Sequence, residues 1–284
     1  MIMVGITGYR MQPKLLPSPF WGLVASFSLL FAGCARIPAP EVTVPTLTPT
    51  VSVGQHPYTA TVQIENKFHV VQTVQVDYLL YLPDAYGQDP QQKWPLILFL
   101  HGRGERGDDL ELLKKNPIPQ ILEQQAGFPA MVVSPQLSRQ KMWWSDMIDP
   151  LNALLYQIQA EYSVDPQRIY LTGLSMGGFG AWEFALRYPQ RFAAVVPIAG
   201  GYKEGDSIIP ENICDLKEVP IWVFHGAHDT IVKPVMSEVL VDALKACGSN
   251  VRFTLYADAE HEESFLRAYA DPELYDWLFA QTKK

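Results

Sequence analysis

The residues best suited to chemistry are a serine, an aspartate and a histidine that occur in that order along the chain. Ser175 lies in the sequence GLSMG, which follows an apolar run and precedes a segment with helical periodicity. This motif between a strand and a helix is typical of a nucleophile elbow, a sharp turn that exposes the serine hydroxyl at a helix N-terminus. Its two glycines have no Cβ to clash in so tight a turn. The motif therefore predicts a nucleophilic Ser175, and a structural turn serine is the alternative.

A serine hydroxyl needs a base before it can attack a carbonyl carbon. The elbow motif requires the order serine, acid, histidine, and only His261 follows both Ser175 and an acid at a strand end. We assign His261 as the base and Asp229 as the acid that orients it. Asp258 and Glu260 are alternative acids, but both lie too close to His261 in sequence to face the far side of its ring.

Two backbone N–H groups are expected to stabilise the oxyanion of the tetrahedral intermediate. One should belong to Met176, the residue after the nucleophile, and the other to the segment HGRGERGDD at 101–109. We predict Arg103 as the second donor, with Gly104 as the alternative. Glycine-rich segments also bind phosphates, but this one lacks the Lys-Ser/Thr ending of a nucleotide-binding loop.

Four side chains are candidates for the substrate pocket. Trp143 and Trp144 follow a strand-end loop, Tyr202 follows a later strand, and His228 stands beside the predicted acid. Core or surface packing is the alternative for the tryptophans, and a structural role is the alternative for His228, as it is for His225. No long insertion interrupts the predicted elements, so we expect little or no lid and an open site suited to short or soluble esters.

The elements that must position these residues alternate between strand and helix. Patterns typical of strands occupy 59–65, 70–82, 95–100, 130–134, 168–172, 193–198, 220–224 and 251–256. Helical patterns occupy 109–125, 150–162, 179–188, 235–247 and 274–280. The alternation predicts an α/β fold, a mostly parallel doubly wound sheet with an antiparallel hairpin at its N-terminal edge. Ligands of such sheets bind at the carboxyl ends of strands, where the candidate residues occur.

The composition favours one folded domain behind an export signal. The chain has 284 residues with 22 Lys+Arg against 30 Asp+Glu, and this net charge of −8 argues against nucleic acid as a partner. Arg10 and Lys14 precede an uncharged stretch at 15–35, in which prolines shorten the apolar run below the length of a membrane span. We read this as a signal peptide; starting translation at Met11 would make it more compact.

Cys34 follows the residues LFAG, and small residues before a cysteine resemble the bacterial lipobox, with phenylalanine where leucine is usual. In that family the signal is cleaved before the cysteine, which then carries lipid. Residues after it are rich in proline and threonine and should stay extended. We expect an exported protein anchored to a membrane by lipid; ordinary secretory cleavage, or an uncleaved anchor, is the alternative. The expected organisation is a signal peptide over 1–33, a lipidated linker over 34–57 and a catalytic domain over 58–284.

The other two cysteines suggest a pair. Cys214 comes before a predicted strand and Cys247 ends the helix that returns from it, so both should lie opposite the active site. An exported protein can keep a disulfide, and we predict a Cys214–Cys247 bond, with two separate thiols as the alternative. Three cysteines without a Cys-x-x-Cys motif do not suggest a zinc site, and we expect no metal or cofactor.

These motifs together resemble the α/β-hydrolase superfamily. From Leu79 to Gln281, segments such as LILFLHGRGERGDD, RIYLTGLSMGGFGAW and IWVFHGAHDTIV are similar to bacterial serine esterases of the phospholipase/carboxylesterase, predicted-peptidase, dienelactone-hydrolase and feruloyl-esterase groups. The resemblance implies the α/β-hydrolase fold and the same roles for the serine, aspartate and histidine. Glu260 departs from the pattern, because such relatives usually have glycine before the histidine.

The leading hypothesis is a hydrolase of small carboxylic esters that works through an acyl-enzyme. A serine peptidase is the second hypothesis, because the same three residues can cleave amides, although no propeller or cap domain is apparent. A non-catalytic binding lipoprotein is the third, and the presence of all three residues counts against it.

Overall fold

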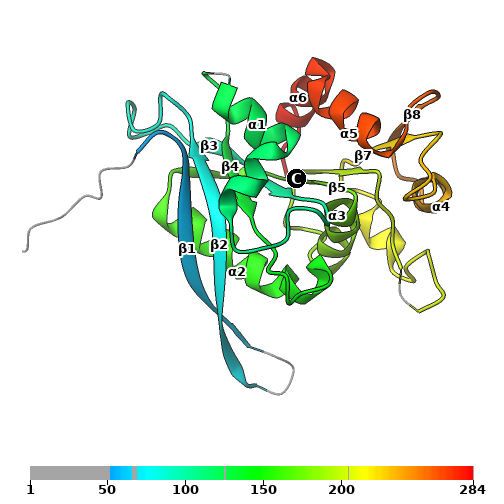
Figure 1. The fold of residues 1–284 in the computed structure, drawn as a ribbon, viewed down its shortest axis with the longest axis horizontal. Helices are drawn as coiled ribbons and strands as arrows, with labels where there is room; N and C mark the ends of the chain where they lie inside the picture. The colour runs from blue at the N-terminus through cyan, green and yellow to red at the C-terminus, as the bar shows by residue number, and fades with distance from the viewer. Residues whose placement is uncertain (1–51, 66–68, 125, 204, 284) are drawn as a thin grey trace, which may run out of the picture. The chain divides into compact units, whose positions relative to one another are not determined.

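The computed structural model describes residues 52–65, 69–124, 126–203 and 205–283 (Figure 1). Eight strands of the described residues form one sheet. They are β1 (Gly54–Glu65), β2 (Val71–Leu82), β3 (Trp94–Leu100), β4 (Met131–Pro135), β5 (Val164–Leu174), β6 (Ala194–Ile198), β7 (Trp222–Gly226) and β8 (Arg252–Tyr256).

Helices connect most of these strands. The α-helices are α1 (Pro117–Gln124), α2 (Ile148–Glu161), α3 (Met176–Arg187), α4 (Val235–Ala246), α5 (His261–Ala270) and α6 (Pro272–Phe279). Short 3₁₀ helices are η1 (Leu110–Lys115), η2 (Trp144–Met147) and η3 (Ile213–Leu216). In the described part of the chain, η3 is the only helix between β6 and β7, so no helical cap is inserted there.

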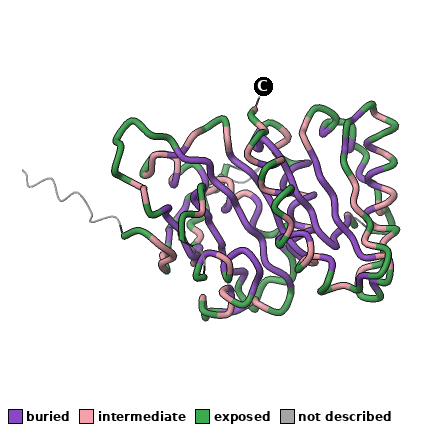
Figure 2. Tube along the Cα trace, turned by 90° about the horizontal axis from the view of Figure 1, so that it is seen from above, coloured by how far each residue is buried: buried purple, intermediate pink, exposed green. Residues whose placement is uncertain are grey.

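The strand order is β1-β2-β4-β3-β5-β6-β7-β8. Strand β2 runs antiparallel to both β1 and β4, and all the other neighbours are parallel. The predicted mostly parallel sheet with an antiparallel N-terminal edge is therefore confirmed. The central strands are buried on both faces, as Figure 2 shows, which explains their continuous apolar sequences.

The sheet separates two hydrophobic cores. Alternate residues of a strand point to opposite faces. In β3, Leu96, Leu98 and Leu100 belong to the core that α2, α3 and α4 cover, whereas Ile97 and Phe99 belong to the core under α1, α5 and α6. Helices on both faces hold the sheet rigid, so the loops at its carboxyl edge have a fixed base.

Two of the differences from the sequence-based boundaries have a clear physical meaning. The helix expected over 109–125 is split, because Asn116 is extended in front of Pro117, and a residue before proline disfavours the α conformation. The linker expected to reach residue 57 ends earlier among the described residues, since Gly54–Pro57 already pairs with β2. Pro57 is tolerated in β1 because this strand lies at the edge of the sheet.

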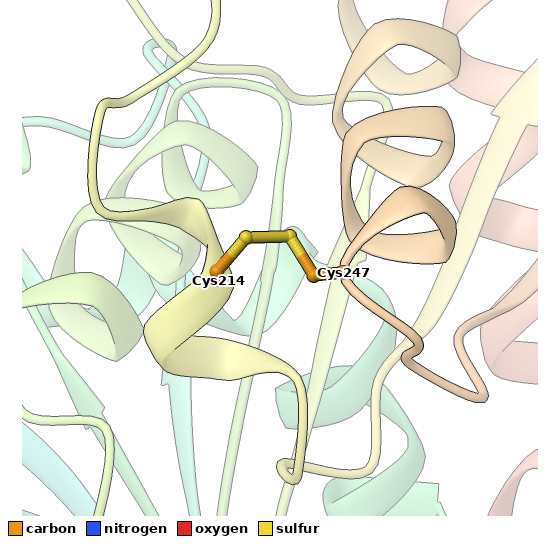
Figure 3. The surroundings of a disulfide bond; sticks show 2 residues. All are labelled: Cys214 and Cys247. Carbon is orange, nitrogen blue, oxygen red and sulfur yellow. A yellow bond between two sulfur atoms is a disulfide. The ribbon is translucent and has the colours of Figure 1, made fainter.

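A disulfide joins Cys214 in η3 to Cys247 at the end of α4, with their Cα atoms 5.4 Å apart (Figure 3). It ties the connection between β6 and β7 to the helix that follows β7. The predicted lipid acceptor, Cys34, lies outside the described residues. Within those residues, we find no helix that has both the length and the apolar character needed to cross a membrane.

Candidate active site

Ser175 sits on the turn between β5 and α3. Its backbone has a φ of 53° and a ψ of −119°, a left-handed conformation that is strained for a residue with a side chain. The turn is held from both sides, because the Ser175 N–H donates to the Ile198 carbonyl at 2.9 Å and its carbonyl accepts from the Phe179 N–H at 3.1 Å. The hydroxyl is thereby presented at the N-terminus of α3, beside the N–H of Met176.

The elbow glycines allow the turn to pack directly on other backbone. A Cβ on Gly173 would lie 2.3 Å from the Gly177 carbonyl oxygen, and a Cβ on Gly177 would lie 2.0 Å from the Leu100 carbonyl oxygen. Both distances are far below van der Waals contact. Glycine at these positions is therefore required by close backbone approach between the elbow and the end of β3.

We expect the Gly177→Ala substitution to destabilise the protein by more than about 4 kcal/mol, because two backbone segments must separate to admit the methyl group. The matched control is Gly104→Ala, since a Cβ on Gly104 meets nothing within 4 Å. Urea unfolding followed by circular dichroism measures both. A Gly177→Ala protein as stable as the control would show that the elbow is not packed in this way.

Ser175, His261 and Asp229 form a continuous hydrogen-bonded chain. His261 Nε2 lies 2.9 Å from Ser175 Oγ, and His261 Nδ1 lies 2.6 Å from Asp229 Oδ2. The His261 side chain is 14% exposed and the Asp229 side chain is fully buried. A carboxylate has only acceptors, so Asp229 accepts a hydrogen bond from Nδ1–H, and Nε2 is then the nitrogen that can accept from the Ser175 hydroxyl.

Asp229 is fixed by a second set of donors. Its Oδ1 accepts from the backbone N–H groups of Ile231 and Val232, each at 2.9 Å. His225 Nε2 lies 3.2 Å from Oδ2, and burial lowers the pKa of His225, so its imidazole is neutral. Sequence reasoning favoured a structural role for His225. The structure places its ring beside the buried acid, with Nδ1 2.7 Å from Ser237 Oγ and Nε2 2.9 Å from the Val232 carbonyl oxygen.

The alternative acids are engaged elsewhere. Asp258 is exposed and pairs with Arg267 at 2.6 Å. Glu260 is the N-cap of α5 and forms a capping box with Glu263, in which each side chain accepts from the other residue's backbone N–H. Helix α5, which starts at His261, was not predicted from sequence, because its N-cap is a glutamate and not one of the serine, threonine, aspartate or asparagine residues that usually mark a helix start.

The loop after β3 approaches the nucleophile closely. A Cβ on Gly102 would lie 3.8 Å from the Ser175 Cβ. His101 Nε2 accepts from the Leu137 N–H at 3.0 Å, so the ring proton is on Nδ1, which donates to the Gly102 carbonyl at 2.5 Å. Burial lowers the pKa of His101 to about 4, which keeps this neutral tautomer. His101 therefore anchors the loop that was predicted to supply the second oxyanion donor, a role that sequence reasoning missed.

A cleft of about 490 Å³ opens at Ser175. Arg103 and Met176, the residues predicted to supply the oxyanion donors, both line it. Trp143 lines it too, and its ring packs against that of Phe179 with centroids 5.7 Å apart. Met142, which precedes Trp143 in the same predicted segment, lines it as well. The residues that sequence reasoning missed here are mostly apolar: Phe179, Ile231, Val232, Val235 and Met236, with Lys203 and Lys233.

The structure places three of the candidate pocket residues outside this cleft. Trp144 is buried against Gly180, and its Nε1–H donates to the His101 carbonyl at 3.1 Å. It therefore helps to hold the loop that follows β3. Tyr202 lines a neighbouring cavity of about 470 Å³ that does not include Ser175. His228 is exposed and is not among the residues that line the cleft. All three residues lie in loops or at their ends, and the direction of such side chains is set by loop conformation, which the sequence pattern does not give.

The described residues contain no group of three or more His, Cys, Asp or Glu side chains that could hold a metal ion. The chemical groups linked to Ser175 are its own hydroxyl, the imidazole of His261, the buried carboxylate of Asp229 and the backbone N–H of Met176. This set suits nucleophilic attack on a carbonyl carbon followed by proton transfer to a leaving group.

The sheet order, the elbow after β5 and the acid and histidine after β7 and β8 define an α/β-hydrolase. The model of the phospholipase/carboxylesterase family matches residues 119–266, just over half of the chain. The chain therefore belongs to the phospholipase/carboxylesterase family.

Known proteins with similar sequences include several esterases. The chain is 29% identical over 149 residues to a bifunctional acetylxylan esterase/xylanase of Neocallimastix patriciarum, covering 49% of this chain and 20% of that protein. It is 27% identical over 164 residues to feruloyl esterase C of Emericella nidulans, covering 55% of this chain and 56% of that protein. The matched region is thus less than two thirds of either relative.

A solved structure described as a thermostable esterase is also similar. It is 32% identical in sequence, with a TM-score of 0.60, and the match covers 79% of this chain and 63% of that one. The α/β-hydrolase fold implied by the sequence motifs is therefore confirmed.

Proposed function

We propose that this protein hydrolyses carboxylic esters through an acyl-enzyme formed on Ser175. The observation that carries the proposal is the hydrogen-bonded chain from Ser175 Oγ through the imidazole of His261 to Asp229, at 2.9 Å and 2.6 Å. Membership of the phospholipase/carboxylesterase family supports the same conclusion.

In the proposed reaction, His261 Nε2 takes the Ser175 proton as Oγ attacks the ester carbonyl carbon. The backbone N–H groups of Met176 and Arg103 stabilise the resulting oxyanion, and Asp229 stabilises the imidazolium. His261 then protonates the leaving alkoxide, which departs as the alcohol. Water, activated by the same imidazole, attacks the acyl-enzyme and releases the carboxylic acid.

The cleft favours small esters with an apolar or aromatic part. Its volume of about 490 Å³ lies within the range of pockets that bind small molecules. The Trp143–Phe179 pair offers an aromatic surface, and relatives named as feruloyl and acetylxylan esterases support an ester substrate of this kind.

The experiment compares an ester with an amide of the same acyl group. We expect the purified protein to release 4-nitrophenol from 4-nitrophenyl butyrate, and 4-nitroaniline from the corresponding anilide far more slowly. Hydrolysis of amides or peptides in preference to esters would favour a peptidase. If neither is cleaved and a fluorophosphonate does not label the protein, a non-catalytic binding role is favoured instead.

We further propose that the protein is exported and anchored to a membrane through lipid on Cys34. The signal-like segment before Cys34 supports this, as does the Cys214–Cys247 disulfide, which is compatible with an oxidising compartment. Metabolic labelling with palmitate in a bacterial host should label the full chain and not Cys34→Ser. Equal labelling of both would contradict the anchor.

A further inference from the structure

The cleft at Ser175 is positively charged in a protein that is negatively charged overall. Arg103, Lys203 and Lys233 line it, and no Asp or Glu is among the described residues that do so. The whole chain carries a net charge of −8. Three cations without a carboxylate therefore stand at one concave surface, although acids outnumber bases in the sequence.

These three charges are not neutralised by ion pairs among the described residues. Five of the other cations in the described part of the chain are paired in that way: Lys114 with Glu111, Arg168 with Asp165, Arg187 with Asp149, Arg252 with Glu273 and Arg267 with Asp258. Arg106 instead holds the loop, because it donates to the carbonyl oxygens of Arg103 and Lys141. Within the described ranges, no ion pair therefore holds any of the three cleft cations.

The rest of the lining is apolar. Trp143, Ile231 and Val235 are exposed large hydrophobic side chains that line this cleft, and the ring of Phe179 packs against that of Trp143. A concave surface lined by charges of one sign raises the local concentration of the opposite charge, and low-dielectric walls strengthen the effect. The ligand that complements such a surface has an apolar or aromatic body and a negative charge.

We propose that the preferred substrates are anionic esters, in which an apolar or aromatic body carries a carboxylate that Lys203 and Lys233 recognise. The inference rests on the proposed ester hydrolysis and specifies its substrate class. The carboxylate can belong either to the acyl part or to the alcohol part of the ester. Because both give the same chemistry at the cleft, the two sources are separated by experiment.

The test uses two matched pairs of soluble substrates at low ionic strength. For the acyl side, 4-nitrophenyl hydrogen adipate is compared with 4-nitrophenyl hexanoate, after subtraction of the spontaneous rate. For the alcohol side, 4-carboxyphenyl butyrate is compared with 4-carbamoylphenyl butyrate, which is neutral and of similar shape. The readout is the anionic-to-neutral ratio of kcat/KM. We expect a ratio of about 10 in one of the two pairs, which decreases when salt is raised.

The variants assign the effect to residues. In the double variant Lys203→Gln/Lys233→Gln we expect the ratio to fall at least about fivefold, because both cations are replaced by neutral side chains of similar length. The control is Lys217→Gln, whose side chain lines separate cavities that do not include Ser175, and its ratio should equal that of the unmodified protein.

The outcomes are distinguishable from failure of the proposed function. If no ester is hydrolysed, the proposed function itself is wrong. If neutral esters are hydrolysed and neither pair gives a ratio above 1, the anionic substrate class is overturned and the esterase stands. A high ratio that persists in the double variant, or that falls equally in Lys217→Gln, overturns the assignment to this cleft.

Discussion

Replacing Ser175 by alanine should lower kcat/KM for 4-nitrophenyl butyrate by about 10⁴-fold or more. The substitution removes the Oγ that lies 2.9 Å from His261 Nε2, and no acyl-enzyme can form without it. The remaining oxyanion donors and the cleft can only assist direct attack by water. Folding should be retained, because alanine keeps the Cβ that the elbow already accommodates.

The matched control is Ser145→Ala, a substitution of an exposed serine that lines the neighbouring cavity and not the cleft. Its activity should stay within about twofold of the unmodified protein, as expected for a surface change. Hydrolysis that survives in Ser175→Ala and is lost in Ser145→Ala would contradict the assignment of the nucleophile.

The second large effect should come from Asp229→Asn, with a loss of about 10⁴-fold in kcat. Both carboxylate oxygens of Asp229 accept hydrogen bonds, Oδ1 from Ile231 and Val232 and Oδ2 from His261. An amide has only one oxygen. If that oxygen accepts from the two backbone N–H groups, the NH₂ faces Nδ1, and the ring proton moves to Nε2. His261 then presents a donor to Ser175 and cannot act as its base.

Asp258→Asn is the control, because Asp258 is an exposed acid that the sequence offered as an alternative to Asp229. It should leave kcat close to that of the unmodified protein, and the full pH profile of both variants should be measured. If kcat fell sharply in Asp258→Asn and stayed normal in Asp229→Asn, the assignment of Asp229 as the acid would be wrong.

The fold was predictable because its signals are local. The apolar run of β3 reflects the burial of this strand on both faces. The strand–GLSMG–helix pattern reflects the close backbone packing that Gly177 permits. Strands and helices separate Ser175, Asp229 and His261 along the chain. Because each residue follows a recognisable strand, all three could be assigned from the sequence.

The lining of the cleft was less predictable because it depends on tertiary contacts between loops. Trp143 and Trp144 are adjacent in sequence, yet one lines the cleft and the other fills the space beside Gly180. The anchoring role of His101 depends on Leu137, which belongs to another loop. Neither contact leaves a periodic or compositional pattern, so sequence could not distinguish these alternatives.

The most direct test of the central claim is intact-protein mass spectrometry after reaction with a fluorophosphonate, followed by peptide mapping. If Ser175 is an activated nucleophile, one adduct forms on each molecule, it maps to the peptide containing Ser175, and it is absent from Ser175→Ala and strongly slowed in Asp229→Asn. A protein that hydrolyses esters but takes no adduct, or takes it at another residue, would contradict the account.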